Sequence, residues 1–245
     1  MNTIDFGIDA PTAIRNLFIT SFSALIVFIG SIIFIPANLL ITIFEVWLLL
    51  VFFSTLIIPV FMIISSKYSK ISNRDKLLER VNLNGEETIL DIGCGRGLFT
   101  IGAAAKITTG KVYGIDIWNS KDLSENSETS IAKNIRESGL EKVVELRTED
   151  MRQMSFPANY FDIVIASFSI HNITEVGERK RALSEILRVT KGSGEIIIIE
   201  FKNTKEYVTY FKDKKCEVVF DSRAKGVFPI ARNLIIKKNV AEQAA

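Results

Sequence analysis

The chain has 245 residues, of which 30 are lysine or arginine and 28 are aspartate or glutamate, so its formal net charge is only +2. This balance excludes the strong basic field that is typical of nucleic-acid-binding proteins, and we expect no nucleic-acid partner. The two cysteines, Cys94 and Cys216, are too few for a disulfide framework and fit a reducing compartment.

Two apolar stretches near the N-terminus predict transmembrane helices at about residues 14–35 and 39–64. Each is close to or longer than the ~20 apolar residues that cross a bilayer. Only Pro36, Ala37 and Asn38 separate them, so we expect a helical hairpin with both ends on the same side of the membrane. A cleaved signal peptide is the alternative for the first stretch, but a second stretch follows at once and no A-x-A site separates the two.

Basic residues flank this hairpin and predict its orientation. Arg15 precedes it, and four basic side chains follow: Lys67, Lys70, Arg74 and Lys76. By the positive-inside rule these ends lie in the cytoplasm. We therefore expect residues 1–66 to form an integral membrane anchor, with the lipid bilayer as a partner, and residues 67–245 to form a catalytic domain that faces the cytoplasm.

Beyond residue 66 the sequence alternates between strand-like and helical segments. A short amphipathic helix is predicted over residues 72–82, with Ser72 or Asn73 as its cap. The segments after it are strand 87–91, helix 97–106, strand 111–116, helix 127–138, strands 142–147 and 161–167, helix 177–190, strand 195–201, helix 204–213 and two strands at 216–222 and 232–238 that are close enough to pair. This alternation predicts a parallel α/β sheet with a terminal antiparallel strand. The last residues, 240–245, are expected to be a frayed tail.

The run ILDIGCGRGLFT starts at residue 89, within the first of these strands, and carries glycines at alternate positions from 93 to 97. A dinucleotide-binding loop would carry its last glycine where Leu98 stands, so a hydride-transfer enzyme is disfavoured. Asp91 at the end of the strand would repel a phosphate and attract an amino group. The loop therefore predicts a ligand with a cationic, amino-acid-like end, and S-adenosylmethionine is such a ligand.

Five motifs, in order and in register, make residues 74–238 resemble a class I S-adenosylmethionine-dependent methyltransferase. They are LDIGCGRG, VYGIDIW, TEDMRQMSF, FDIVIASFSIHNI and LRVTKGSGEIIIIEF. The resembling group includes quinone-biosynthesis C-methyltransferases and many small-molecule and lipid enzymes. The resemblance implies a Rossmann-like, mostly parallel seven-stranded sheet with a terminal antiparallel strand. It also implies S-adenosyl-L-methionine as cofactor, S-adenosyl-L-homocysteine as product and no metal ligand.

The resemblance assigns the glycine loop to the methionine part of the cofactor. Backbone groups of Gly93, Cys94 and Gly95 would lie against it, Gly97 belongs to the same loop, and Asp91 would lie near the ammonium group. We interpret Cys94 as a small side chain beside a backbone-binding loop, not as a nucleophile.

The resemblance assigns later strand ends to the ribose and the adenine. Asp116 would accept both ribose hydroxyl hydrogens. Ile117 and Trp118 would flank the adenine, although Trp118 is equally suited to the core. Asp150 would accept from the adenine amino group, with the Met151 backbone nearby.

The loop after the fourth strand, SFSIHN, begins at Ser167, a further predicted cofactor-binding residue. Class I enzymes meet their acceptor here, because ligands bind beyond the carboxyl ends of parallel strands. His171 is the only histidine in the chain and the one side chain whose ordinary pKa suits proton removal near neutrality. The alternative is that His171 only shapes the loop, since methyl transfer from a sulfonium can proceed by alignment and desolvation alone.

Almost no sequence separates strand 195–201 from the next helix, where many small-molecule methyltransferases insert a substrate lid. We therefore expect an acceptor pocket that is completed by the hairpin and by helix 72–82, whose first turn would lie over the pocket mouth. Such a pocket faces the bilayer and predicts methyl transfer to a lipophilic or membrane-associated small molecule. The alternatives are a methyltransferase acting on membrane proteins and a non-catalytic cofactor-binding scaffold.

Overall fold

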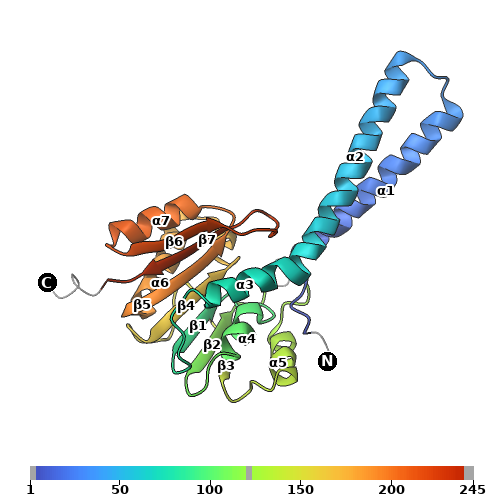
Figure 1. The fold of residues 1–245 in the computed structure, drawn as a ribbon. Coiled ribbons are helices and arrows are strands. Elements are labelled where there is room, and N and C mark those ends of the chain that lie inside the picture. The colour runs from blue at the N-terminus through green and yellow to red at the C-terminus, as the bar shows by residue number, and fades with distance from the viewer. Residues whose placement is uncertain (1–3, 120–122, 240–245) are drawn as a thin grey trace.

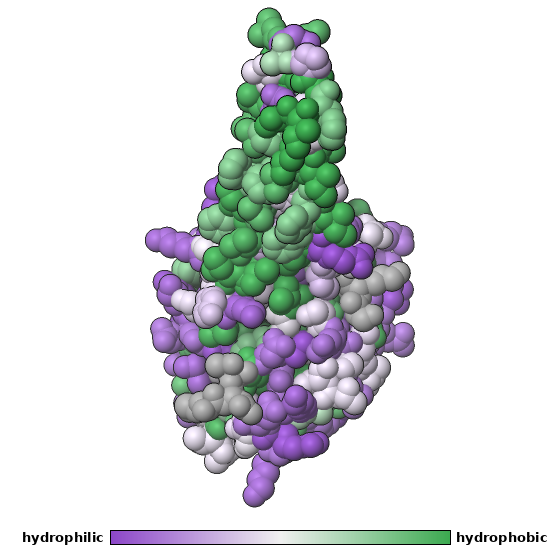
Figure 2. Space-filling view, turned by 90° about the vertical axis from the view of Figure 1, so that its right-hand side faces the viewer, coloured by the Kyte–Doolittle hydropathy of each residue, from purple (hydrophilic) through white to green (hydrophobic). Residues whose placement is uncertain are grey.

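The computed structural model describes residues 4–119 and 123–239, so the tail predicted at 240–245 lies outside the described residues. The chain has two parts, a long helical hairpin and an α/β domain from which the hairpin projects (Figure 1). The apolar surface is concentrated on the hairpin, whereas the visible face of the domain is mainly hydrophilic (Figure 2).

The hairpin consists of α1 (Pro11–Phe34) and α2 (Leu39–Ile64), and it confirms the two predicted helices. The side chain of Asn38 caps α2 by accepting a hydrogen bond from Ile41 N at 3.0 Å. The two helices pack through small polar side chains, because Ser31 Oγ donates to Glu45 Oε1 at 3.0 Å and Ser21 Oγ donates to Phe52 O at 3.1 Å. Glu45 therefore has a partner inside the hairpin.

The segment after the hairpin differs from the prediction. Helix α2 continues through one π-helical turn, η1 (Ser65–Ser69), into α3 (Lys70–Leu78), so no separate helix begins at Ser72 or Asn73 and none reaches residue 82. The physical reason is that no proline or glycine lies between residues 60 and 84, so nothing interrupts the helix. Asn73 does not cap a helix; its side-chain amide pairs with that of Asn233 at 2.9 and 3.0 Å.

Seven strands form one sheet, which confirms the predicted number of strands, and their order is β3-β2-β1-β4-β5-β7-β6. Strands β1 to β5 are parallel, and β7 is antiparallel to both of its neighbours. The strands are β1 (Thr88–Ile92), β2 (Lys111–Asp116), β3 (Val144–Thr148), β4 (Phe161–Ser167), β5 (Thr190–Glu200), β6 (Glu217–Arg223) and β7 (Arg232–Lys237).

Strand β5 begins five residues earlier than predicted, directly after the preceding helix. Phe161 pairs with Thr190 but Ile163 pairs with Glu195, so the intervening residues form an irregularity in the strand rather than the expected turn. Lys191 in this irregular stretch pairs with Asp162 at 2.8 Å, which assigns Asp162 a structural role at the start of β4.

Helices cover both faces of the sheet. They are α3, α4 (Leu98–Ala104) and α5 (Glu128–Glu137) on one face and α6 (Val176–Val189) and α7 (Thr204–Asp213) on the other, with a 3-10 turn, η2 (Ile170–Asn172), after β4. Neighbouring strand residues point to opposite faces, so Ile89 and Leu90 enter two separate apolar clusters. The carboxyl ends of β1, β2 and β4 remain uncovered by these helices and bound the site described next.

Candidate functional site

A cavity of about 720 Å³ lies at the carboxyl ends of β1, β2 and β4. Its size falls within the usual range for small-molecule sites. One end is the glycine loop between β1 and α4. The other end reaches Met62 and Ser66 at the base of the hairpin, together with Phe228 from the β6–β7 loop. The cavity is therefore continuous from the sheet to the hairpin.

The glycine loop presents backbone to this cavity. Gly93 has φ +66°, and a Cβ placed on it would lie 2.4 Å from Ser169 Cβ, so no larger residue fits without displacing the loop after β4. Gly95 also has positive φ and lines the cavity. Gly97 does not line the cavity; it precedes α4, and a Cβ there would meet Ile131 in the core.

Asp91 lies at the cavity wall and is nearly fully buried. Burial raises the pKa of its carboxyl to about 7, although hydrogen bonds from Thr100 oppose the rise, the hydroxyl at 2.6 Å among them. Burial and the neighbouring carboxylates also raise the pKa of the Cys94 thiol. Cys94 therefore stays protonated near neutrality, which fits a small side chain rather than a nucleophile. A cationic group beside Asp91 would stabilise its ionised form.

Asp116 ends β2 with both oxygens held by backbone amides. Gly95 N donates to Oδ2 at 2.8 Å and Trp118 N donates to Oδ1 at 2.7 Å. Ile117 is exposed and lines the cavity. Trp118 has φ +58° and does not line the cavity; its indole N–H donates to Thr148 Oγ1 at 2.8 Å and its ring packs against the core. The geometry favours Ile117, not Trp118, as a side chain that flanks a ligand.

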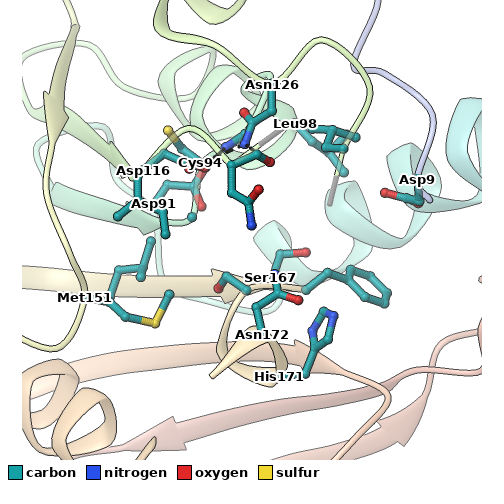
Figure 3. A pocket seen from close by; sticks show the side chains of 18 of the residues that line it. Asp9, Asp91, Cys94, Leu98, Asp116, Asn126, Met151, Ser167, His171 and Asn172 are labelled. Carbon is teal, nitrogen blue, oxygen red and sulfur yellow. Dashed lines mark hydrogen bonds between the residues drawn. The ribbon is translucent and has the colours of Figure 1, made fainter. Parts of the chain in front are cut away.

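Asp150, Met151 and Ser167 all line the cavity, and Figure 3 shows Met151 and Ser167 across from Asp91 and Asp116. Arg152 holds the Asp150 carboxylate through its guanidinium, with Nε 3.0 Å from both oxygens. Hydrogen bonds from Arg152 lower the pKa of Asp150, so this carboxylate is charged and fixed in orientation near neutrality.

Three buried polar atoms of residues that line the cavity lack a hydrogen-bond partner among the described residues: Arg96 Nε, Asn126 Oδ1 and Ser169 Oγ. The Asn126 amide nitrogen lies 3.5 Å from Asp116 Oδ1, which places its oxygen beside the predicted ribose site. Orphaned polar atoms inside a cavity are suited to a polar ligand. Together with the backbone cradle at Gly93 they fit a nucleotide-like cofactor. Asn126 lies between β2 and α5, where the sequence offers no pattern that would have identified it.

His171 projects toward the cavity from η2 (Figure 3). Its Nδ1 lies 2.8 Å from Glu200 Oε2, and its backbone N–H donates to Glu200 Oε1 at 3.2 Å. Glu200 ends β5 and is completely buried. When Nδ1 carries the proton toward Glu200, Nε2 is left as an acceptor for the cavity. Glu200 was missed in the sequence, although an acid that ends an apolar strand is the same signal that identified Asp91 and Asp116.

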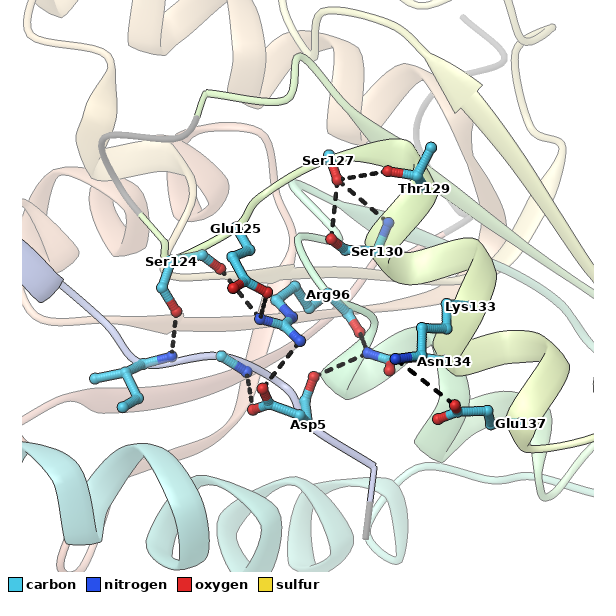
Figure 4. A network of polar contacts seen from close by, with 12 residues as sticks. Asp5, Arg96, Ser124, Glu125, Ser127, Thr129, Ser130, Lys133, Asn134 and Glu137 are labelled. Carbon is cyan, nitrogen blue, oxygen red and sulfur yellow. Dashed lines mark hydrogen bonds and ion pairs between the residues drawn. The ribbon is translucent and has the colours of Figure 1, made fainter. Parts of the chain in front are cut away.

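The N-terminal strap, residues 4–10, crosses the domain beside the glycine loop (Figure 4). Asp5 pairs with Arg96 at 3.0 Å, and its carbonyl accepts from Asn134 Nδ2 at 2.9 Å. Ile8 N donates to Ser124 Oγ at 2.9 Å. Strap residues including Phe6 line the cavity. This strap could not be predicted from the sequence, because residues 4–10 contain no recognisable motif.

The strap joins α1 at the base of the hairpin. Asp9 forms an ion pair with Lys70, and its backbone N–H donates to Ser66 Oγ at 3.3 Å. The Lys70 ammonium also lies 3.8 Å from the centroid of the Phe168 ring. All four side chains line the cavity.

No residue from 72 to 82 lines the cavity, so the prediction that this segment covers the pocket mouth is wrong. Continuous helix places Leu77 and Leu78 in the core instead. Arg74 is directed onto α4, where its guanidinium donates to Leu98 O at 3.2 Å.

The chain is similar to known methyltransferases in sequence. A family described as "Methyltransferase domain" matches residues 90–198. A phosphatidylethanolamine N-methyltransferase of Cereibacter sphaeroides is 33% identical over 128 residues, covering 52% of this chain and 57% of that protein. A demethylmenaquinone methyltransferase of Lactobacillus johnsonii is 31% identical over 130 residues, covering 52% and 49%. The chain thus spans about half the length of these curated relatives.

Among solved structures, the [4+2]-cyclase SpnF superposes with a TM-score of 0.60 at 18% identity, covering 72% of this chain and 84% of that one. At this identity the likeness concerns the fold alone.

Proposed function

The chain carries a class I S-adenosylmethionine-dependent methyltransferase domain, and on that premise we propose that it transfers a methyl group to a lipophilic acceptor from a membrane-anchored position. The observation that carries this proposal is the continuity of the cavity from the glycine loop to Met62 and Ser66 at the base of the hairpin.

At the sheet end, the cofactor site is assembled from strand ends. The Gly93–Gly95 backbone and the Asp91 carboxyl are suited to the methionine part, and Asp116 with Asn126 to the ribose hydroxyls. Ile117, Asp150 and Met151 line the part of the wall that remains for the adenine. S-adenosylmethionine, when bound, supplies an electrophilic methyl group on a sulfonium sulfur.

At the hairpin end, the wall is largely apolar. It includes Phe6, Met62, Phe168, Phe201 and Phe228, and these side chains come from five different parts of the chain. Such a wall accommodates a hydrophobic acceptor and excludes water from the transfer. The names of the relatives agree with this class of acceptor, since one is a phosphatidylethanolamine and another a demethylmenaquinone methyltransferase.

The membrane position is supported by α1 and by the continuous helix that begins with α2. Both are long and apolar enough to cross a bilayer, and only 17% and 22% of their most apolar windows are buried in the protein. Large side chains near the tip are exposed, such as Phe34 at 83% and Leu40 at 78%. A core helix of a water-soluble domain would bury this surface, whereas a bilayer covers it. Basic residues at the base favour a domain on the cytoplasmic side.

His171 is suited to remove a proton from the acceptor. The buried Glu200 carboxylate holds His171 by two contacts, one at the imidazole Nδ1 and one at the backbone N–H, which leaves Nε2 as the free ring nitrogen and a suitable base. The imidazole lies beside the ring of Phe201, with 4.5 Å between the ring centroids. The proton would pass from the acceptor to Nε2, and the positive charge that develops on the ring would be stabilised by Glu200.

The test is methyl transfer by the full chain in nanodiscs. Tritium-labelled S-adenosylmethionine is supplied with a total bacterial lipid extract, and the label is followed into organic-soluble, protein and aqueous fractions. We expect label in the organic-soluble fraction. The Asp116→Ala variant should give no label when the cofactor concentration is kept below the raised Kd of that variant. Label that appears in membrane proteins would instead identify a protein methyltransferase. Cofactor binding without label in any fraction would identify a non-catalytic scaffold.

A further inference from the structure

The loop between β6 and β7, residues 224–231, lies at the base of the hairpin (Figure 1). Phe228 N donates to Ser65 Oγ at 2.7 Å, and the same hydroxyl lies 3.3 Å from Phe228 O. Ser65 is completely buried. The loop is therefore fixed to the end of α2 although the two are more than 160 residues apart in the sequence.

The two sides of this loop differ. Phe228 and Pro229 line the cavity, whereas the next residue, Ile230, is 66% exposed. On the neighbouring helical turn Tyr68 is 70% exposed. One side of the loop thus faces the cavity, and the other offers a bulky apolar side chain to the surroundings.

Basic side chains accompany this apolar surface. Lys67, Arg223 and Lys225 are exposed, and within residues 4–119 and 123–239 no carboxylate forms an ion pair with them. An exposed isoleucine and tyrosine beside uncompensated cations are suited to the boundary of a bilayer with anionic headgroups.

The depth of the loop agrees with such a boundary. A hydrocarbon core of about 30 Å corresponds to roughly 20 helical residues at ~1.5 Å each. Helix α2 is longer than this, since its apolar run extends over 26 residues from Leu39 to Ile64, about 39 Å at ~1.5 Å each. A stretch longer than the hydrocarbon core is accommodated by tilting of the helix. Ser65 directly follows this apolar run, and Tyr68 lies about 6 Å beyond Ile64 along the helix, within the headgroup layer of roughly 5 to 7 Å on each side.

We propose that the β6–β7 loop is a second membrane contact, in which Ile230 enters the boundary between headgroups and acyl chains while Lys67, Arg223 and Lys225 bind anionic phospholipid headgroups. This contact turns the cavity wall formed by Phe228 and Pro229 toward the bilayer, so that an acceptor enters sideways from the lipid without crossing water. The inference rests on the proposed membrane anchorage of the hairpin.

The experiment uses the full chain in nanodiscs of phosphatidylcholine, with or without phosphatidylglycerol. A polarity-sensitive fluorophore is attached at Ile230→Cys and, as a matched control, at Val219→Cys, which is 41% exposed on β6. Both native cysteines are buried. We expect a blue-shifted emission and quenching by headgroup-labelled nitroxide lipid at position 230 but not at 219. We also expect the quenching to increase at least twofold with phosphatidylglycerol and to lose this increase when Lys67, Arg223 and Lys225 are all changed to glutamine.

Equal emission spectra at positions 230 and 219 would overturn the membrane contact. If quenching at position 230 does not increase with phosphatidylglycerol, the proposed role of the basic residues is overturned. The anchorage is measured separately through Trp47 in α2, whose fluorescence should be quenched by lipids brominated in their acyl chains, with Trp47→Phe as the blank. If Trp47 is quenched and position 230 is not, only the loop contact fails. If Trp47 is not quenched, the hairpin anchorage fails first.

Discussion

The two ends of the cavity are constructed in different ways. At the sheet end the polar side chains are fixed by the parallel strands that carry them: Asp91 is the next-to-last residue of β1, Asp116 ends β2 and Ser167 ends β4. Backbone amides hold Asp116 directly. This end depends mainly on the sheet and on the loops that follow its strands.

At the hairpin end, neighbours in space are far apart in the sequence. Phe6 comes from the strap, Met62 and Lys70 from the long helix, and Phe228 from the β6–β7 loop. They meet because Asp9 pairs with Lys70 and Phe228 bonds to Ser65. Under the proposed function, cofactor binding would therefore depend mainly on the sheet, whereas acceptor choice would depend on where the hairpin is held.

Substitution at the hairpin end should reduce turnover most and leave the sheet end intact. We expect His171→Ala to lower the rate of methyl transfer by about 100-fold or more, because general base catalysis typically contributes that much. Glu200→Gln should lower it by roughly tenfold, since the imidazole loses a charged partner. Single-turnover assays with saturating cofactor measure both rates. Cofactor affinity within twofold of the original serves as the control, and an undiminished rate for His171→Ala would mean that His171 only shapes the loop.

Substitution at the sheet end should act on cofactor affinity instead. Asp116→Ala removes an acceptor of the ribose hydroxyls and should cost about 1.5 to 3 kcal/mol, which is roughly a 10- to 150-fold weaker Kd. Isothermal titration calorimetry measures this loss, and Asp213→Ala on the exposed side of α7 is the matched control. The original chain should give no heat with a nicotinamide dinucleotide. An unchanged Kd for Asp116→Ala would remove Asp116 from the site.

The pH dependence of cofactor binding should report the Asp91 carboxyl. In the free protein burial raises its pKa to about 7, and a cationic ligand prefers the ionised form. Affinity should therefore fall by about tenfold per unit as the pH decreases below 7. The Asp91→Asn variant should bind the cofactor more weakly, and its affinity should not show this fall with decreasing pH. Calorimetry between pH 6 and 8 measures the slope, and a flat profile in the original chain would contradict the assignment of Asp91 to the ammonium.

The same carboxyl has the opposite effect on the stability of the free protein. Because its pKa is higher in the folded chain than in the unfolded chain, its stabilising contribution is complete below about pH 4 and is lost as the pH rises through 7. Denaturant titration of the free protein should show this loss reduced in Asp91→Asn.

The smallest effect is expected for the strap, which links the two ends. Asp5→Asn removes an ion pair whose carboxylate is largely exposed, so we expect cofactor dissociation to accelerate only about two- to fivefold. Stopped-flow fluorescence measures the rate. Lys133→Gln removes the exposed Lys133–Glu137 pair on α5 and should leave the rate unchanged. Equal rates in both variants would show that the strap does not restrain the cofactor.

The sequence by itself determined the α/β sheet, its terminal antiparallel strand, the hairpin helices and most of the residues at the sheet end of the cavity. The reason is that these features depend on local periodicity and on side chains at strand ends, which parallel pairing necessarily brings to one edge. Glu200 was within reach of the same reasoning. Trp118 and Gly97 were also predicted from the sequence as cofactor-binding residues. Neither lines the cavity, and both have a positive φ that the sequence does not reveal.

Only the tertiary structure decided the hairpin end of the cavity. Whether Ser66 and Lys70 or the segment 72–82 faces the pocket depends on the phase of one continuous helix, and a single π-helical turn at Ser65–Ser69 shifts that phase. The strap and the β6–β7 loop have no periodic pattern, and their positions follow from contacts with residues more than 50 positions away. Long-range contacts of this kind leave no mark in a short stretch of sequence, because each partner is an ordinary polar residue by itself.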